Sequence, residues 1–330
     1  MEIVLILLGF CILVYTFLDF FHTTLSGQGF GWMTGKINRL LGRAILKNRN
    51  TFIFKYSGIL HLLVTTLFWL LMLFLGSFII YASSPDMVIT SDSKLPATLA
   101  ERLYYTGFVI STLGIGDFIP GKDLSRVITT LLSFSGFILL TTALTYLISV
   151  VNTVLQKKQL AIYISTLGND INELYDSVIT PEGINLLVRN TNSIREMIIR
   201  NSSNYIFFPI IQYYLSGNKE DALELQLVRL YEVLTVLGFQ FEQDSGQALK
   251  IKSIIATIVN YVGLGLEEQD YYSFAPEEIE KQREFWTRYS LTYPSQPKAD
   301  KAMNASLLSA GWRWEDVYRL EQKKASEFKG

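Results

Sequence analysis

Three long apolar runs set what this 330-residue chain can fold into. They cover roughly Ile3–Phe21, Ser57–Tyr81 and Val127–Leu155, and they carry almost no charge. A helix needs about 20 apolar residues to cross the hydrocarbon core of a bilayer. Because lipid offers no hydrogen bonds, a crossing segment must satisfy its own backbone, as a helix does. The sequence therefore predicts an all-α membrane protein with three spans.

The first run could instead be a secretory signal peptide. Such a peptide has a basic start and a small-residue cleavage site. Here Glu2 is the early charge, and the bulky residues Phe20 and Phe21 end the run. We therefore expect a retained transmembrane helix.

Loop charge predicts how the spans are oriented. Residues 22–56 contain bases and no acid, whereas residues 83–124 contain more acids than bases. Short basic loops favour the cytoplasmic side. We therefore predict a multi-pass protein of the plasma membrane, with its N-terminus outside and residues 156–330 in the cytoplasm.

The basic loop also carries a helical pattern. Its apolar residues and its basic residues recur on different faces: Ile37, Leu40, Leu41, Ala44 and Ile45 against Lys36, Arg39, Arg43 and Lys47. An amphipathic helix of this kind can lie on a bilayer that contains anionic lipid. A short solvated connector is the alternative, and the pattern leaves both open.

A polar gap between the second and third runs holds the segment Ser-Thr-Leu-Gly-Ile-Gly-Asp, residues 111–117. Glycine adopts backbone angles that turn a peptide oxygen toward an axis. Several such segments around one axis could replace the water shell of a cation. Upstream, Ser93 and Pro96 predict a helix start, with a short helix over Ala97–Val109 that ends at the segment. The partial negative charge at the end of that helix would favour a cation.

Residues 112–117 resemble the T-V-G-Y-G-D signature of potassium channels, and Phe-Ile-Pro-Gly after them resembles the second pore loop of two-pore-domain potassium channels. The resemblance covers roughly residues 95–152. It implies a re-entrant pore helix and a selectivity filter between an outer and an inner helix. The implied ion-binding residues are Thr112, Leu113, Gly114, Ile115 and Gly116. The implied filter supports are Tyr104 and Tyr105, with Asp117 at the outer mouth.

One departure from the signature concerns selectivity. Ile115 stands where the signature has tyrosine, so the hydrogen bonds of a phenol cannot form there. The resemblance implies K⁺ as the permeant ion, and a weakly selective monovalent cation channel is the alternative. A single filter segment per chain requires four chains around the axis, which predicts a homotetramer.

The third run would be the inner helix. Every fourth residue from 129 gives a mostly hydroxyl-bearing stripe that could line a water-filled cavity: Thr129, Ser133, Phe137, Thr141, Thr145 and Ser149. Alternatively, these hydroxyls bond back to their own helix. Gly136 is a candidate hinge or a site of close packing, and Asn152 is a candidate gate residue.

Three ionisable residues lie in or near the first two runs: Asp19, His22 and His61. Such residues are functional candidates by default. We expect an interfacial structural role for each, with proton sensing as the alternative.

The C-terminal half predicts a helical domain, with apolar periodicity over Ala161–Leu174, Ile184–Ile199, Asp221–Leu237 and Ala248–Val262 and a further helix from Pro276. The apolar segment at 205–211 predicts a core or subunit contact. Acid pairs at 267–268 and 277–278 are more typical of solvated helix ends than of a divalent-cation site. The sequence contains no dinucleotide fingerprint and no catalytic constellation. We therefore expect that the protein is not an enzyme and binds no cofactor. No long basic run indicates nucleic acid.

Together these features predict three regions. Residues 1–56 form the N-terminal span and basic loop, residues 57–155 form the pore domain, and residues 156–330 form a cytoplasmic helical domain. The predicted function is a tetrameric potassium channel gated by an unidentified stimulus on that domain. A non-conducting membrane sensor is the alternative from another class.

Overall fold

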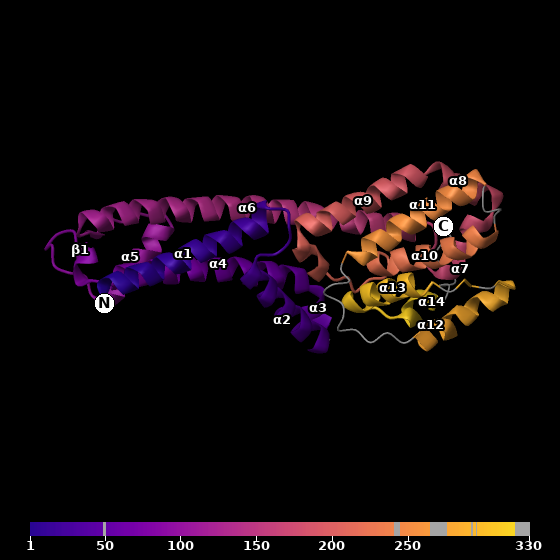
Figure 1. The fold of residues 1–330 in the computed structure, drawn as a ribbon, viewed down its shortest axis with the longest axis horizontal. Helices are drawn as coiled ribbons and strands as arrows, with labels where there is room; N and C mark the ends of the chain where they lie inside the picture. The colour runs from indigo at the N-terminus through magenta and orange to yellow at the C-terminus, as the bar shows by residue number, and fades with distance from the viewer. Residues whose placement is uncertain (49–50, 241–244, 265–275, 292, 295, 321–330) are drawn as a thin grey trace, which may run out of the picture. The chain divides into compact units, whose positions relative to one another are not determined.

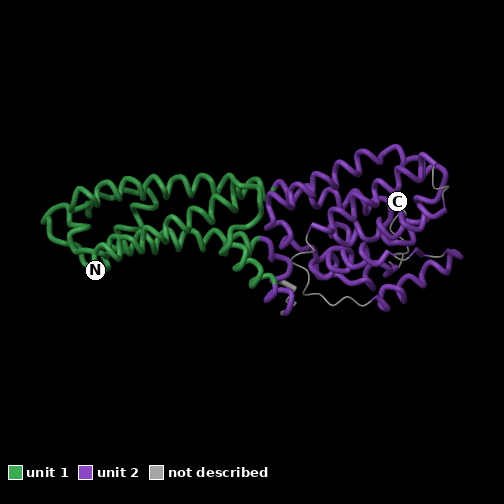
Figure 2. Tube along the Cα trace, viewed as in Figure 1, with its two compact units in different colours: residues 1–42, 59–151 green, residues 43–58, 152–330 purple. Residues whose placement is uncertain are grey.

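The computed structural model describes residues 1–48, 51–240, 245–264, 276–291, 293–294 and 296–320. Its helices and strands run in the order shown in Figure 1. The chain divides into two compact units, coloured in Figure 2. Unit 1 comprises residues 1–42 and 59–151, and unit 2 comprises residues 43–58 and 152–330. Each unit is described by itself.

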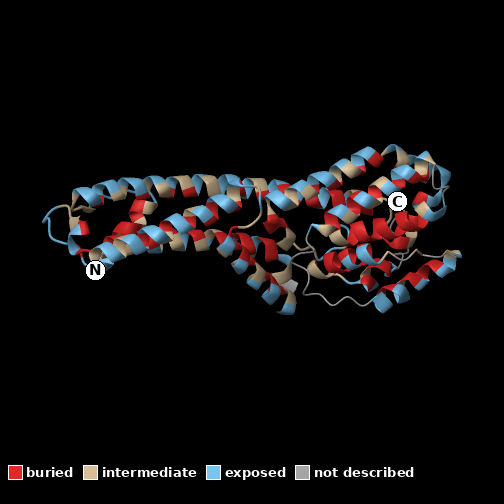
Figure 3. Ribbon diagram, in the orientation of Figure 1, coloured by how far each residue is buried: buried red, intermediate tan, exposed pale blue. Residues whose placement is uncertain are grey.

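Three long helices dominate unit 1 or begin in it: α1 (Glu2–Leu25), α4 (Ser57–Ala82) and α6 (Asp123–Ser165). All three are long and apolar enough to cross a membrane, which confirms the predicted fold class and its spans. At most a third of the residues in the most apolar part of each helix are buried, as expected for a lipid-facing helix (Figure 3). The shorter helices α2 (Trp32–Asn48) and α3 (Thr51–Lys55) lie between α1 and α4 in the sequence.

The segment between α4 and α6 contains the short helix α5 (Leu99–Ile110). It also contains the 3-10 turn η1 (Pro85–Met87) and two short strands, β1 (Val88–Thr90) and β2 (Phe118–Pro120). The strands pair antiparallel, with Val88 opposite Pro120 and Thr90 opposite Phe118. This pairing joins the chain before α5 to the chain after residues 111–117. The segment from α5 to residue 117 therefore starts and ends at the same pair of strands.

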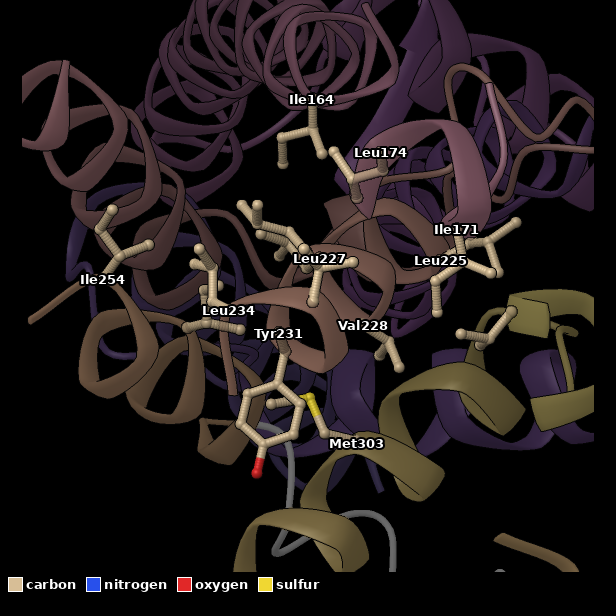
Figure 4. Packing of buried hydrophobic residues seen from close by; sticks show 14 of the residues in the cluster. Ile164, Ile171, Leu174, Leu225, Leu227, Val228, Tyr231, Leu234, Ile254 and Met303 are labelled. Atoms are coloured by element: carbon tan, nitrogen blue, oxygen red, sulfur yellow. The ribbon is translucent and has the colours of Figure 1, made fainter. Parts of the chain in front are cut away.

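Unit 2 is a helical domain around one central helix, α10 (Leu223–Gln240). Every residue from Leu225 to Leu237 is buried, and several of the apolar ones lie in the core shown in Figure 4. A helix that is buried all round needs partners on every side. Those partners include α7 (Ile171–Ile179), α11 (Gly246–Gly263), α13 (Pro297–Ser309) and α14 (Trp314–Tyr318).

The remaining elements of unit 2 are α8 (Pro181–Arg189), α9 (Thr191–Phe207), η2 (Pro209–Tyr213), α12 (Pro276–Arg283) and η4 (Glu284–Tyr289). The predicted helices at 221–237, at 248–262 and from Pro276 correspond to α10, α11 and α12. Of the acid pairs, the one at 277–278 lies exposed in the first turn of α12, and the one at 267–268 lies outside the described residues.

Two predicted helices were wrong, because each is broken. The prediction at 161–174 spans the end of α6 at Ser165 and the start of α7, where Asp170 accepts hydrogen bonds from Asn172 and Glu173. The prediction at 184–199 spans the boundary between α8 and α9 at Asn190. Asparagine and aspartate favour helix ends because their side chains compete for backbone hydrogen bonds.

The buried centre of unit 2 also holds charge. Arg283 donates hydrogen bonds to both oxygens of Glu232, at 2.7 and 3.1 Å, and to both of Asp300, at 2.7 and 2.9 Å. Tyr293 and Tyr318 donate their hydroxyls to Glu232. Burial raises the pKa of Tyr318, and the charge of Glu232 raises it further. The hydroxyl of Tyr318 therefore stays protonated and keeps donating at neutral pH.

Candidate functional site

The site begins with α5, whose start differs from the prediction. Its N-cap is Thr98, whose hydroxyl accepts a hydrogen bond from the Glu101 amide, while the Glu101 carboxylate accepts one from the Thr98 amide. This reciprocal pair is a capping box. Ser93 is not the cap, and Pro96 lies outside the helix in an isolated bridge to Ile89. The predicted start at Ala97 was therefore two residues early.

With 12 residues, α5 is about 18 Å long at 1.5 Å per residue, too short to cross a bilayer. It ends at Ser111, where the polar segment starts. A helix of this length that leads into a loop has the form predicted for a re-entrant pore helix.

The backbone of residues 112–116 alternates in the sign of φ. Thr112, Gly114 and Gly116 have φ of 59°, 58° and 89°, while Leu113 and Ile115 are not among the residues with positive φ. In an ordinary strand successive carbonyls point to opposite sides, and alternation in the sign of φ cancels that reversal. Successive carbonyl oxygens can then face one side, as a ring of ion-binding carbonyls requires. Thr112 is the strongest indication of a constrained backbone here, because a β-branched residue rarely adopts positive φ.

We call residues 112–116 the strip. Hydrogen bonds hold the chain at both ends of the strip and leave its middle exposed. The amides of Thr112 and Leu113 donate to the carbonyls of Val109 and Phe108, at 3.1 and 2.9 Å. At the other end, the Asp117 carbonyl accepts from the Ser91 amide at 2.9 Å. Residues 111–117 are all exposed in the single chain. The strip therefore leaves one side uncovered in the single chain, as expected for one of several chains that together surround a pore.

Aromatic hydroxyls pack behind the strip. Tyr105 is 1 % exposed, and its ring meets Tyr81 edge-on with centroids 4.9 Å apart. Both phenols lie within hydrogen-bonding distance of the Thr129 hydroxyl, at 2.8 Å for Tyr81 and 2.9 Å for Tyr105. A pocket of about 180 Å³ has residues of both groups in its lining, among them Tyr105 and Thr129 together with Thr112, Gly114 and Gly116.

The two predicted tyrosines differ in position. Tyr105 is buried behind the strip, whereas Tyr104 is 45 % exposed and packs edge-on against Phe118 at 6.0 Å. The sequence reasoning missed Tyr81. A tyrosine at the end of an apolar run was its only sequence signal, and its partner Thr129 lies 48 residues away.

The hydroxyl stripe of α6 divides into two parts. The Thr129 hydroxyl lies within hydrogen-bonding distance of the two tyrosine hydroxyls. Its predicted place on the cavity stays a prediction. Further along, the hydroxyls of Thr141, Thr145 and Ser149 donate to the carbonyl four residues earlier, at 2.9 to 3.0 Å. The back-bonded alternative therefore describes their hydrogen bonds. Whether they also line a cavity stays a prediction.

The other inner-helix candidates also have defined places. A Cβ at Gly136 would meet the Ile110 carbonyl oxygen at 2.1 Å, so α6 contacts the end of α5 there. This supports close packing at Gly136. Phe137 is 54 % exposed, and Asn152 is exposed near the unit boundary.

Asp19 has a larger structural role than its sequence position indicates. It is 5 % exposed, and its carboxylate accepts hydrogen bonds from the amides of Met33 and Thr34 at 2.9 and 3.3 Å. The Thr34 hydroxyl and the Trp69 indole, at 3.1 Å, also donate to it. Asp19 on α1 thus caps the first turn of α2 and holds α4. His22 is exposed and His61 is fully buried.

Metal ligands do not gather in the described part of the chain. No group of three or more His, Cys, Asp or Glu side chains there could hold a metal ion.

Comparison with known proteins finds a similarity in the same region. Residues 68–153 match the model of a family described as ion channel. The matched range holds most of α4, all of α5, the strip and the part of α6 up to Thr153.

A relative extends the similarity over more of the chain. The chain is 28 % identical over 265 residues to a protein of Bacillus subtilis (strain 168) described as uncharacterized membrane protein YdjJ. The aligned part covers 78 % of this chain and 76 % of that protein. No solved structure matches the chain. The ion channel match supports the predicted resemblance of the pore region, and the relative supports a membrane protein.

Proposed function

We propose that this protein is a homotetrameric channel that passes K⁺ down its gradient through carbonyls of residues 112–116. The observation that carries the proposal is the alternating φ of this strip, within the region that matches an ion channel family. The Thr112 hydroxyl would complete the innermost ion site. Asp117 would attract cations at the mouth.

The tetramer is inferred from surfaces that the single chain leaves uncovered. A groove of about 460 Å³ lies beside the strip, and its lining includes Phe74, Leu103, Tyr104, Leu113 and Ile115. Leu113 is 67 % exposed and Ile115 is 52 % exposed. Four copies around an axis would cover such apolar residues and would close the ring of carbonyls.

The same proposal includes an orientation. The strip would enter from the outer face, and unit 2 would lie in the cytoplasm, where a stimulus still to be identified acts on it. Anionic lipid would meet α2, whose Trp32 is 62 % exposed with the Lys36 ammonium 3.5 Å from its ring centroid. An aromatic ring and a basic side chain are typical of a membrane interface.

A second candidate is a weakly selective monovalent cation channel. Ile115 carries no hydroxyl, so its side chain can make only apolar contacts at the position where the signature has a phenol. In this chain the hydroxyls behind the strip come from Tyr81, Tyr105 and Thr129. If these hydroxyls hold the carbonyl oxygens at the spacing that K⁺ needs, the channel is selective for K⁺. If they do not, it is the weakly selective channel.

The experiment is cation flux into proteoliposomes that contain the purified protein. The proposal expects K⁺ flux that barium blocks, and a bi-ionic reversal potential that favours K⁺ over Na⁺. Equal permeability for the two ions would favour the weakly selective channel. No flux of either ion from a correctly assembled tetramer would contradict the channel and leave the sensor hypothesis.

A further inference from the structure

The inner end of α6 enters the folded core of unit 2 as a continuous helix. The helix runs unbroken from Asp123 to Ser165, and Leu160, Ala161 and Ile164 are part of the unit 2 core. The helix therefore belongs in part to each unit.

A buried lysine ties α6 to the segment that follows α9. Lys157 is 4 % exposed, and its ammonium pairs with the Glu224 carboxylate at 2.8 Å. The same ammonium donates to the carbonyls of Ile211 and Tyr214, at 3.5 and 3.3 Å. A buried ammonium needs both a counter-charge and hydrogen bonds, and this arrangement provides both. Nearby, Asn204 donates to the Gln156 side chain at 2.8 Å.

The same segment contacts the first turn of α4. A Cβ added at Gly58 would meet the Tyr214 ring at 2.3 to 2.5 Å, so the ring lies directly against the helix backbone. Tyr214 thus binds α6 through its carbonyl and α4 through its ring. Ile210 and Ile211, in η2 just before it, are 0 % and 1 % exposed and anchor the segment in unit 2.

We propose that residues 209–214 are a clamp that couples the inner ends of the outer and inner pore helices to unit 2. The inference rests on the proposed channel function. The ring of Tyr214 fixes the start of α4, the carbonyls of Ile211 and Tyr214 fix α6 through Lys157, and a displacement of η2 moves both helices together. The apolar segment predicted as a core or subunit contact, residues 205–211, overlaps this clamp at residues 209–211.

Two independent perturbations test the clamp in the full-length protein. Gly58→Ala places a methyl group where the Tyr214 ring lies, and Gly58→Ala/Tyr214→Ala restores the space. Gly263→Ala is the matched control, since a Cβ there meets nothing within 4 Å. Lys157→Met removes the buried ammonium, and Lys158→Met is its control, because Lys158 is half-exposed in its pair with Asp221.

Two measurements are made on each variant in proteoliposomes: K⁺ flux with its reversal potential, and hydrogen exchange of peptides covering residues 57–61 and 152–160. Gly58→Ala and Lys157→Met should each change flux by about fivefold or more, the lower range of a coupling between sites. The reversal potential should stay unchanged, because the filter is not altered. Gly58→Ala should also raise exchange in both peptides. The double variant should restore neither readout, because it relieves the clash but lacks the ring that holds α4.

The outcomes separate the clamp from the channel. Wild-type flux that neither substitution changes would overturn the clamp and leave the channel intact. Faster exchange at 57–61 alone after Gly58→Ala would also overturn it, because the two helix ends would then be uncoupled. A wild type without flux would contradict the channel, while the exchange of the two peptides would still decide whether the helix ends move together.

Discussion

Replacing Gly114 with alanine isolates backbone conformation from packing. At Gly114 φ is 58°, and a Cβ built there meets no atom within 4 Å of the chain. The change therefore adds no clash in the single chain, and its cost is the left-handed conformation itself. That cost is about 1–2 kcal/mol for a residue with a Cβ.

The magnitude grows with the number of substituted copies. In a tetramer whose filter conducts only when all four strips hold the alternating conformation, four copies cost about 4–8 kcal/mol. Since about 1.4 kcal/mol corresponds to a factor of ten, the conducting population falls by roughly a thousandfold or more. A single substituted copy should reduce it by about tenfold.

The assay is K⁺ flux into proteoliposomes made with wild-type and Gly114→Ala subunits mixed in known ratios. Gel filtration in detergent checks assembly, and Gly263→Ala serves as the control, because a Cβ there also meets nothing and φ is not positive. Flux should fall steeply as the substituted fraction rises. Wild-type flux through fully substituted, correctly assembled protein would refute the assignment of the strip as the ion pathway.

Three further perturbations test other parts of the molecule. Thr129→Val removes the hydroxyl that both buried phenols contact, at about 1–3 kcal/mol. The bi-ionic reversal potential should then shift toward equal permeability, and an unchanged potential would mean that these hydroxyls do not set selectivity. Asp19→Ala removes the cap of α2 at about 1–2 kcal/mol, so hydrogen exchange should rise at 32–36, whereas unchanged exchange there would contradict the capping role. Burial opposes the charge of Asp221, but hydrogen bonds from Lys158 and Ser216 outweigh it and lower its pKa below 3.8. The stabilisation is therefore present at neutral pH and lost as pH falls through the lowered value, so the Tm difference from Asp221→Asn should vanish in acid.

The three spans could be predicted because lipid imposes a single pattern over a long stretch. A run of about 20 uncharged apolar residues has few structures open to it, and each predicted run became one helix. Short helices gave weaker signals. The sequence pattern predicted the start of α5 at Ser93 and Pro96. Thr98 and Glu101, three residues apart, have the sequence pattern of a capping box and mark the actual start. The prediction relied on Pro96, three residues before the first residue of α5, because proline is common in the first turn of a helix.

The contacts that support the site could not be predicted, because they join residues far apart in the sequence. The Thr129 hydroxyl fits the hydroxyl stripe of α6, yet its partners are on α4 and α5. Lys157 reads as one of two adjacent lysines after an apolar run, yet it is buried and Lys158 is half-exposed. Periodicity assigns residues to a face of a helix, whereas the packing partner of that face depends on the tertiary fold.

The conformation of the strip requires stabilisation that the single chain does not supply in full. Thr112 pays about 1–2 kcal/mol for its positive φ, and the strip is held mainly at its ends, by Val109, Phe108 and Ser91. Its exposed carbonyls gain nothing from facing one another, because like dipoles repel. A cation between four strips reverses the sign of that interaction, and a bound ligand at about 100 times its Kd stabilises the state that binds it by about 2.7 kcal/mol. Strain at Thr112, exposure of the strip and the need for a cation are thus one energetic problem. The proposed tetramer, with a permeant cation between its strips, would relieve all three.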